Sequence, residues 1–248
     1  MDPNDERRVS DANEKDRSAQ GYRLNLGAIE TSLRDLSGDF ASVNSHLTEP
    51  RDPLDEQIVD NMLLGYRLVD TFVAADADLF ADDQVGLMLQ LNDVVLCGDD
   101  AERRRQRDKY HAAAEHRFYD ERDGGIADIL EWYEDHSGES PWKRAAGVFV
   151  RILSQPQLFL EGNHRTGALI MSYILLRAGL PPFVLTLDNA LEYFNPSAVV
   201  RKTLKKNPTA LFKLPKIKAR YAEFLKANAD RRYLLEPQLE SPRGRAES

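Results

Sequence analysis

The chain has 248 residues, of which 42% are hydrophobic and 30% are charged, and its formal net charge is -8 at pH 7. This amount of apolar sequence suffices for one large domain or two small ones, while the acidic balance excludes a general attraction to nucleic acid or anionic lipid. The single cysteine, Cys97, excludes an internal disulfide, and within its apolar segment it is expected to be a small buried hydrophobic residue.

Both ends of the chain are polar. Residues 1–20 have no apolar spacing that could bury one face, so we expect a disordered tail there, and a polar tail over residues 237–248. No apolar segment of the signal-peptide type follows Met1, and no apolar run reaches membrane-spanning length. We therefore expect a cytoplasmic protein with no membrane partner.

The first half of the chain predicts helices. Residues 24–47 are expected to form one or two short helices, and residues 54–74 form a clear amphipathic pattern. A further amphipathic helix is predicted over residues 79–97, ending at Gly98. Residues 101–123 are charged and contain alanines, without the alternating β-branched residues of a strand, so a helix is predicted there too.

The segment 101–123 carries four arginines near its start and two histidines. We expect the arginines to form a solvated face rather than a ligand site. His111 and His116 are five residues apart and fall on different faces of a helix. They are therefore poor ligands for one shared metal ion.

The second half of the chain predicts the central helices. Residues 126–136 indicate a short amphipathic helix, and Ser140 followed by Pro141 is typical of a helix start before the apolar spacing of residues 142–153. Residues 168–178 are almost wholly apolar. A helix that is apolar on all sides lies in the middle of a core.

Three further features follow this apolar helix. Residues 183–187 are expected to form a strand or an extended connector, and Asn195 with Pro196 is predicted to cap another helix. Residues 201–220 are locally basic with interleaved apolar residues. We interpret them as helices with a solvated cationic face, and we do not expect a nucleic-acid partner.

Residues 157–168, QLFLEGNHRTGA, form a polar turn between two apolar helices. Gly162 allows a sharp backbone bend, and the first turn of the following helix offers unpaired amides to an anion. Arg165 would add a bidentate phosphate contact, and Glu161 could hold a metal ion that bridges to the phosphate. The alternative is an ordinary helix–turn–helix corner with a solvated arginine.

This turn resembles the Fic (Fido) family, in which a core helix, a loop reading H-P-F-x-D/E-G-N-G-R-x-x-R and a second helix follow one another. The matching residues are Phe159, Glu161, Gly162, Asn163 and Arg165, with Thr166 and Gly167 also similar. The departures are Gln157 for the catalytic His, Leu158 for Pro, His164 for the second Gly and Ala168 for the last Arg. The resemblance is specific over residues 140–185. It implies an all-α, Fic-like helical domain over residues 21–236, with a core at about 79–185 and N- and C-terminal helical additions.

The resemblance also implies ligands for this turn. Glu161 would bind Mg²⁺, and the phosphates of ATP or a related nucleotide would be held by Gly162, Asn163, Arg165, Thr166 and Gly167. In the family, the motif His deprotonates a target hydroxyl, which attacks the α-phosphate and becomes AMPylated. Gln157 has no titratable lone pair near neutral pH, and general-base catalysis is commonly worth ~10²–10⁴-fold. Ala168 cannot clamp the terminal phosphates either.

Two residues could modify this chemistry. His164 titrates in a useful range, so it is a candidate base in place of Gln157, or else has a phosphate-binding or structural role. Residues 45–49 (SHLTE) fit the spacing of the inhibitory helix S/T-x-x-x-E-G/N of some Fic proteins, which makes Glu49 a candidate inhibitory residue. However, Pro50 replaces the final Gly or Asn, and the arginine with which that Glu would pair is Ala168 here.

The sequence therefore predicts a Fic-fold protein that binds a nucleotide or phosphate ligand at the EGNHRTG loop, with canonical AMPylation impaired or altered. Two alternatives stay open: an active nucleotidyl- or phosphoryl-transferring enzyme that uses His164 or another base, and a helical interaction module whose turn is only structural. A protein partner is also considered. Relatives often carry a β-hairpin flap for the target peptide where the helix over residues 101–123 is predicted, so a target would be presented differently.

Overall fold

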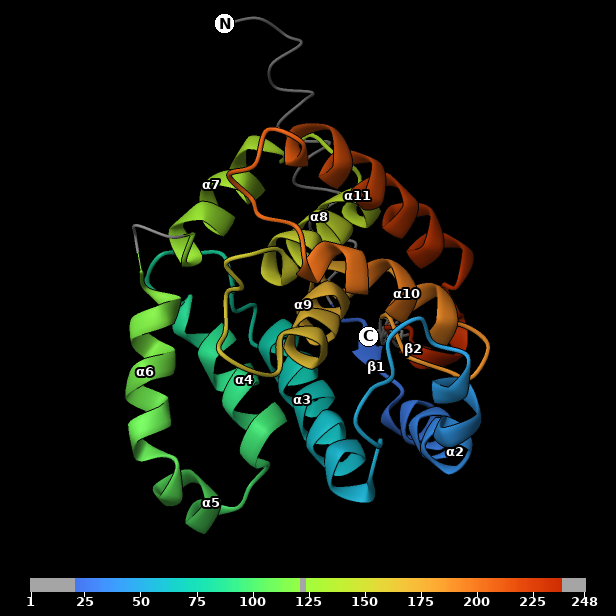
Figure 1. The fold of residues 1–248 in the computed structure, drawn as a ribbon. Helices are drawn as coiled ribbons and strands as arrows, with labels where there is room; N and C mark the ends of the chain where they lie inside the picture. Colours follow the sequence, from blue (N-terminus) through green and yellow to red (C-terminus); the bar gives the residue numbers. More distant parts are fainter. Residues whose placement is uncertain (1–20, 121–123, 238–248) are drawn as a thin grey trace, which may run out of the picture.

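The computed structural model describes residues 21–120 and 124–237. Within these ranges the fold is all-α, as predicted, with ten α-helices and two very short strands (Figure 1). The predicted tail over residues 1–20 lies outside the described residues, as does all of the predicted C-terminal tail except Pro237. None of the helices in the described part of the chain combines the length and the apolar character needed to cross a bilayer.

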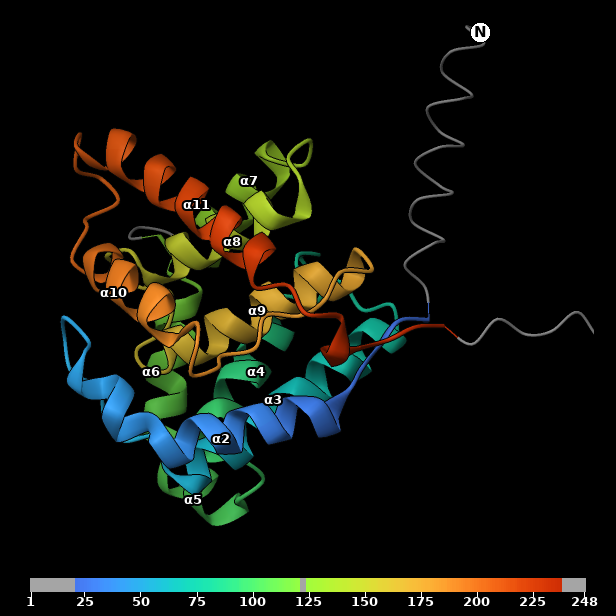
Figure 2. The same ribbon diagram turned by 90° about the vertical axis from the view of Figure 1, so that its right-hand side faces the viewer.

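The elements follow one another along the chain with short connections. The α-helices are α2 (Leu26–Ser45), α3 (Glu56–Ala74), α4 (Gly86–Cys97), α5 (Ala101–Gln106), α6 (Asp108–Phe118), α7 (Ile126–Asp135), α8 (Pro141–Leu153), α9 (Asn163–Arg177), α10 (Ala190–Arg201) and α11 (Ala210–Ala227). The strands β1 (Arg23–Leu24) and β2 (Leu234–Leu235) pair antiparallel, and a 3₁₀ helix, η1 (Arg231–Tyr233), precedes β2. This pairing brings the two ends of the described domain together (Figure 2).

Helix α9 is the centre of the molecule (Figure 1). Every residue from Thr166 to Leu176 is buried, and α3, α4 and α8 all pack against it. In Figure 2, α2 and α11 lie on opposite sides of α9. An all-round apolar helix is stable only where neighbours cover each of its faces, so the apolar run that begins at Ala168 places this helix inside the core, as predicted.

The structure defines two of the predicted helices in the first half more closely. The segment 24–47, predicted as one or two short helices, contains one helix of 20 residues, α2. The helix predicted over residues 79–97 begins only at Gly86. Before it, Asp78 Oδ1 accepts a hydrogen bond from the Phe80 amide, and Gln84 Oε1 accepts one from the Asp78 amide. These side-chain bonds hold a turn in place of the first helical bonds.

The charged segment that begins at residue 101 is helical as predicted, but it is divided into α5 and α6 at Arg107. The arginines of α5 form ion pairs with nearby acidic residues: Arg103 with Asp100, Arg104 with Asp93, and Arg105 with Glu102. They are therefore part of a surface network of positively and negatively charged side chains, which is consistent with a solvated face.

The region after α9 contains one wrong prediction. Residues 183–187 form the extended connector, without strand pairing. Asn195 and Pro196 do not cap a helix but lie inside α10, which begins at Ala190. The helix starts earlier because Asn189 Oδ1 accepts a hydrogen bond from the Thr186 amide, which closes the turn that precedes α10. Asn195 instead uses its side-chain oxygen to accept bonds from Thr48.

The close contact between α7 and α8 predicts a stability difference between two glycines. A Cβ atom at Gly147 of α8 would lie 1.9 Å from Cη2 of Trp132, whereas one at Gly38 of α2 would meet nothing within 4 Å. Gly147→Ala should therefore lower the free energy of unfolding by about 1–3 kcal/mol through overpacking. Gly38→Ala should raise it by about 0.5–1 kcal/mol, because a helix-interior glycine costs conformational entropy. Urea denaturation of the two variants measures both effects, and equal stabilities would contradict the α7–α8 packing described here.

Candidate anion site at the start of helix α9

The loop between α8 and α9 is closed by one side chain. Asn163, the first residue of α9, accepts a hydrogen bond at Oδ1 from the Phe159 amide (3.0 Å) and donates one from Nδ2 to the Phe159 carbonyl (2.7 Å). Both residues are buried. The side-chain carboxamide of Asn163 thus satisfies both the amide and the carbonyl of Phe159. These two bonds fix the loop against the start of the helix.

The start of this loop is anchored to other parts of the fold. The Gln155 amide donates to the Thr203 carbonyl (2.8 Å), and the Lys205 amide donates to the Gln155 carbonyl (2.7 Å). Arg117 of α6 donates from Nε to the Gln157 carbonyl (2.8 Å). These bonds attach the loop to α6 and to the segment that follows α10.

The end of the loop is anchored to α4. Asn92 Nδ2 donates to the Glu161 carbonyl and to Thr166 Oγ1, both at 3.0 Å. Gly162 between them has φ +73°, and a Cβ atom there would lie 2.9 Å from Asn92 Nδ2. Glycine is therefore required at this position both by the left-handed backbone and by the close approach of Asn92.

The first turn of α9 keeps its amides available. The Thr166 amide donates to the Gly162 carbonyl, but within the described residues the amides of Asn163, His164 and Arg165 donate to no backbone carbonyl. Unpaired amides at a helix N-terminus, together with the helix dipole, favour an anionic ligand.

A cavity of about 460 Å³ lies in front of this turn. It is lined by the loop and the start of α9, by the segment that joins α2 to α3, and by residues of α2, α3 and α10. Three arginines line it, Arg51, Arg165 and Arg201, with two acidic residues, Asp52 and Glu161. Its apolar lining residues are Phe40, Leu54, Ile58, Leu160, Leu185 and Phe194. A volume of this size and a mixed lining are typical of small-molecule sites.

Arg165 and Glu161, the two charged residues of the predicted site, already have partners. Arg165 lines the cavity but donates from Nη1 to the Val95 carbonyl (3.0 Å). Burial lowers the pKa of Arg165, and Glu161 opposes that effect. Glu161 forms an ion pair with Arg107 (Nη2–Oε2, 2.9 Å). A metal ion at Glu161 would have to compete with Arg107 or share the carboxylate with it.

His164 lines the cavity but is largely enclosed by neighbouring side chains. Its Nε2 lies 2.9 Å from Ser197 Oγ, and the rings of Phe149, Tyr193 and Phe194 surround it. Burial, and after it the charges of Arg51 and Arg201, lower the pKa of His164 to about 3. The imidazole is therefore neutral at physiological pH and adds no positive charge to the site.

The remaining motif positions have structural contacts. Gln157 lines the cavity, and its Nε2 donates to the Leu153 carbonyl (3.2 Å). Thr166 and Gly167, which were predicted to lie beside the phosphates, are not among the residues that line this cavity. Thr166 is fully buried and bonded by Asn92, and Gly167 faces Phe149, whose Cδ2 would lie 2.9 Å from an added Cβ.

Glu49 differs from the expected inhibitory position. It forms ion pairs with Arg201 (2.6 Å) and with Lys202. Lys202 and then Arg201 lower the pKa of Glu49. The motif position with which such a glutamate was expected to pair, Ala168, is buried in the core. Glu49 therefore reduces the positive charge of α10 rather than that of α9.

Sequence reasoning missed two arginines of the cavity, Arg51 and Arg201. Arg51 donates from Nη2 to Ser197 Oγ (3.3 Å), while its buried Nε has no hydrogen-bond partner within the described residues. Burial, and next the charge of Arg201, lower the pKa of Arg51. No motif marks these residues, because only the fold brings the α2–α3 segment beside α10.

Comparison with known proteins finds a local sequence similarity to two protein adenylyltransferases. Over 72 residues the chain is 35% identical to the protein adenylyltransferase fic-1 of Caenorhabditis briggsae, and likewise to that of Caenorhabditis elegans. The match covers 28% of this chain but only 14% of each of those proteins, far less than their whole length. No family model matches the chain, and no solved structure does.

Proposed function

We propose that the cavity at the start of α9 binds a nucleotide or a related phosphate ligand together with Mg²⁺, and that canonical AMPylation is impaired or altered. One observation carries the proposal. Three arginines, Arg51, Arg165 and Arg201, line the same cavity as the first turn of α9, whose amides are free. Arginine guanidinium groups and the free amides of a helix N-terminus both bind phosphate in proteins.

The electrostatics of Arg51 support this proposal. The charge of Arg201 disfavours the protonated form of Arg51, and Arg51 Nε is buried without a partner in the described part of the chain. Buried polar groups are nearly always hydrogen-bonded. An anion in the cavity would accept that hydrogen bond and offset the repulsion between the two guanidinium groups.

The roles of Glu161 and Glu49 follow from their present partners. Glu161 would contribute one carboxylate oxygen to a hard, oxygen-bound cation such as Mg²⁺ while Arg107 keeps the other. Glu49 would restrain ligand binding by neutralising Arg201, whose positive charge would otherwise face the ligand.

Transfer chemistry has little support from the residues at the site. Gln157 occupies the place of the family's base, and Ala168 lacks a guanidinium. His164 is a poor substitute, because a base works best when its pKa is near the operating pH, whereas burial holds the pKa of His164 at about 3. The active-enzyme alternative would therefore depend on a base carried by the substrate.

One observation favours the purely structural alternative. Arg165 is bonded to the Val95 carbonyl and Glu161 to Arg107, so both have a role in holding the loop without any ligand. In that case the turn would serve only the packing of α4, α8 and α9 in a helical interaction module.

Calorimetric titration with ATP and Mg²⁺ separates ligand binding from a structural turn. We expect the unmodified chain to bind, and Arg51→Ala or Arg165→Ala to weaken the affinity by about 10–100-fold, since a hydrogen bond to a charged group is worth about 1.5–3 kcal/mol. Arg34→Ala is the matched control, because Arg34 pairs with Glu30 and Asp60 away from the cavity.

Two further results bear on this titration. Glu49→Gln should not weaken binding, because it removes a negative charge beside Arg201. If the unmodified chain gives no heat of binding with ATP, ADP or inorganic phosphate, the proposal is wrong. The turn would then have only a structural role.

Transfer of labelled AMP from ATP to the chain itself or to lysate proteins tests the chemistry. We expect none from the unmodified chain and none from Gln157→His, because Ala168 still cannot clamp the terminal phosphates. Ala168 is only 5% exposed, so an arginine could not be added there without disturbing the core. Recovery of transfer by Gln157→His alone would show that the last arginine of the motif is dispensable.

The buried state of His164 predicts how stability depends on pH. Its folded pKa of about 3 lies below the ordinary pKa of histidine, 6.5, so the unfolded chain binds more protons between these values. This contribution is fully present above pH 6.5 and is lost as the pH falls towards 3, with a slope of up to about 1.4 kcal/mol per pH unit. Urea denaturation at several pH values should show this slope reduced in His164→Asn and unchanged in His116→Gln, whose histidine is exposed. Equal slopes in all three proteins would mean that His164 is solvated, and would reopen its role as a base.

A further inference from the structure

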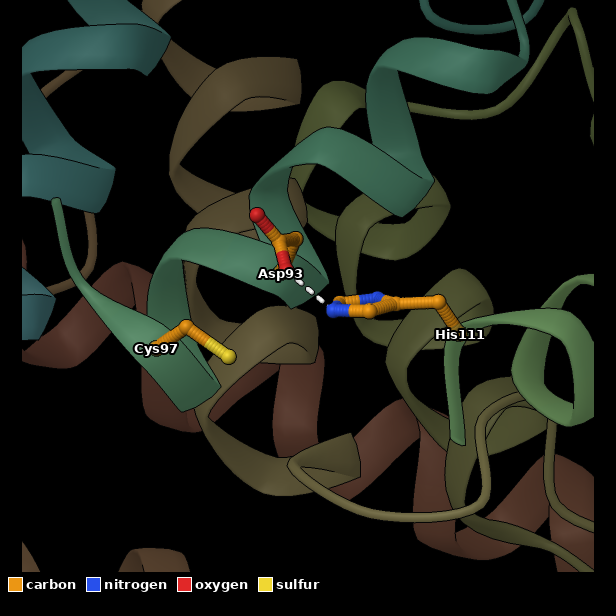
Figure 3. A group of neighbouring side chains, drawn as sticks. All are labelled: Asp93, Cys97 and His111. Atoms are coloured by element: carbon orange, nitrogen blue, oxygen red, sulfur yellow. Dashed lines mark ion pairs between the residues drawn. The ribbon is translucent and has the colours of Figure 1, made fainter. Parts of the chain in front are cut away.

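A second cluster of chemistry-bearing side chains lies between α4 and α6, outside the cavity at α9. Asp93 and Cys97 are four residues apart on α4 and therefore lie on one face of that helix. His111 of α6 lies opposite them, with its imidazole next to the carboxylate and with Cys97 Sγ directed towards the same space (Figure 3). One ligand atom from each of the three residues lies within 4.8 Å of the others.

The spacing of these atoms suits a tetrahedral metal ion. Zn²⁺ takes imidazole nitrogen and carboxylate oxygen at about 2.0–2.2 Å, so two such ligands at the tetrahedral angle lie about 3.3 Å apart. Asp93 Oδ1 and His111 Nε2 are separated by 3.4 Å. The sulfur of Cys97 completes a set of three different donors, all of which are zinc ligands in proteins.

Two of these atoms lack hydrogen bonds. Asp93 Oδ1 and His111 Nε2 are both buried and face each other at ion-pair distance, but neither makes a well-aligned hydrogen bond within the described residues. Because buried polar atoms are nearly always hydrogen-bonded, a cation between these two atoms would satisfy both of them. A neighbouring cavity of about 240 Å³, lined by Asp93 and His111, provides access for an ion from solvent.

The nearby arginines leave the ligand atoms free. Arg104 forms an ion pair with the other carboxylate oxygen, Oδ2 (2.7 Å), and also donates to the Gly98 carbonyl (2.5 Å). Arg107 is paired with Glu161. A partner on the second oxygen orients a ligating carboxylate rather than replacing the metal ion.

The donor set also suits a divalent cation by charge. The Asp93 carboxylate and a thiolate at Cys97 would together balance its two positive charges.

We propose that Asp93, Cys97 and His111 form a Zn²⁺ site, with the fourth coordination position facing the cavity. On binding, the Cys97 thiol releases its proton to solvent and forms a Zn–S bond, while Asp93 Oδ1 and His111 Nε2 each donate a lone pair. No electron is transferred. The site joins α4 to α6 and is independent of the proposed ligand cavity at α9.

Titration of the metal-free chain with Co²⁺ tests the site directly, because a cobalt–thiolate bond gives charge-transfer absorption. We expect one equivalent to bind with this absorption and with the visible bands of tetrahedral coordination. Cys97→Ser should abolish the charge-transfer absorption, and His111→Gln should weaken the affinity at least about tenfold. His116→Gln is the matched control, since His116 is on the same helix but outside the cluster. Absence of charge-transfer absorption at saturating Co²⁺, or equal weakening by both histidine variants, would overturn the proposal.

A second measurement keeps the native thiol and so does not depend on the folding of Cys97→Ser. Cys97 is the single cysteine of the chain, so the rate of alkylation by iodoacetamide reports on this thiol alone. Zn²⁺ should slow that rate at least about tenfold in the unmodified chain and in His116→Gln, but not in His111→Gln. Equal protection in His111→Gln, or none in the unmodified chain, would show that the three residues do not act as one site.

Discussion

The pairing of the Asn163 side chain with the backbone of Phe159 is the constraint on which the candidate anion site depends. Without it, the Phe159 amide and carbonyl would be buried without partners, at a cost of about 1–3 kcal/mol for each group. With it, the loop turns back onto the first residue of α9, and the free amides of that helix face the cavity. Since α9 is the most buried helix, these amides are held by the rigid centre of the molecule, as a preorganised binding site requires.

The positive charge around the cavity comes from three separate parts of the fold. Arg165 belongs to α9, Arg51 to the segment before α3, and Arg201 to the end of α10. Each has an internal partner: Arg165 donates to the Val95 carbonyl, Arg51 donates to the Ser197 hydroxyl, and Arg201 forms an ion pair with Glu49. The site is therefore neither a bare cationic pocket nor a fully neutralised one. An anionic ligand would exchange some of these internal contacts for its own.

The sequence was sufficient to predict the features that depend on neighbouring residues. The apolar run of α9, the start of α8 at Pro141 and the required glycine at position 162 each follow from local chemistry, and the structure confirms all three. The late start of α4 could not be predicted, because it depends on side-chain bonds of Asp78 and Gln84 that compete with the helix. Arg51 and Arg201 could not be predicted as cavity residues either. They are far apart in the sequence, so no local motif or residue spacing marks them. The same reason hid the contact of His111 with Asp93 of α4.

Because β1 pairs with β2, the two ends of the described domain leave the molecule at one edge. Closely spaced ends are the geometry that tolerates circular permutation and insertion of one domain into another. A short linker from Leu235 to Arg23 would join them without stretching the helical core, and new ends could be opened at a surface turn elsewhere. This fold is therefore suited to being carried as a compact insert, tethered to another protein at a single point.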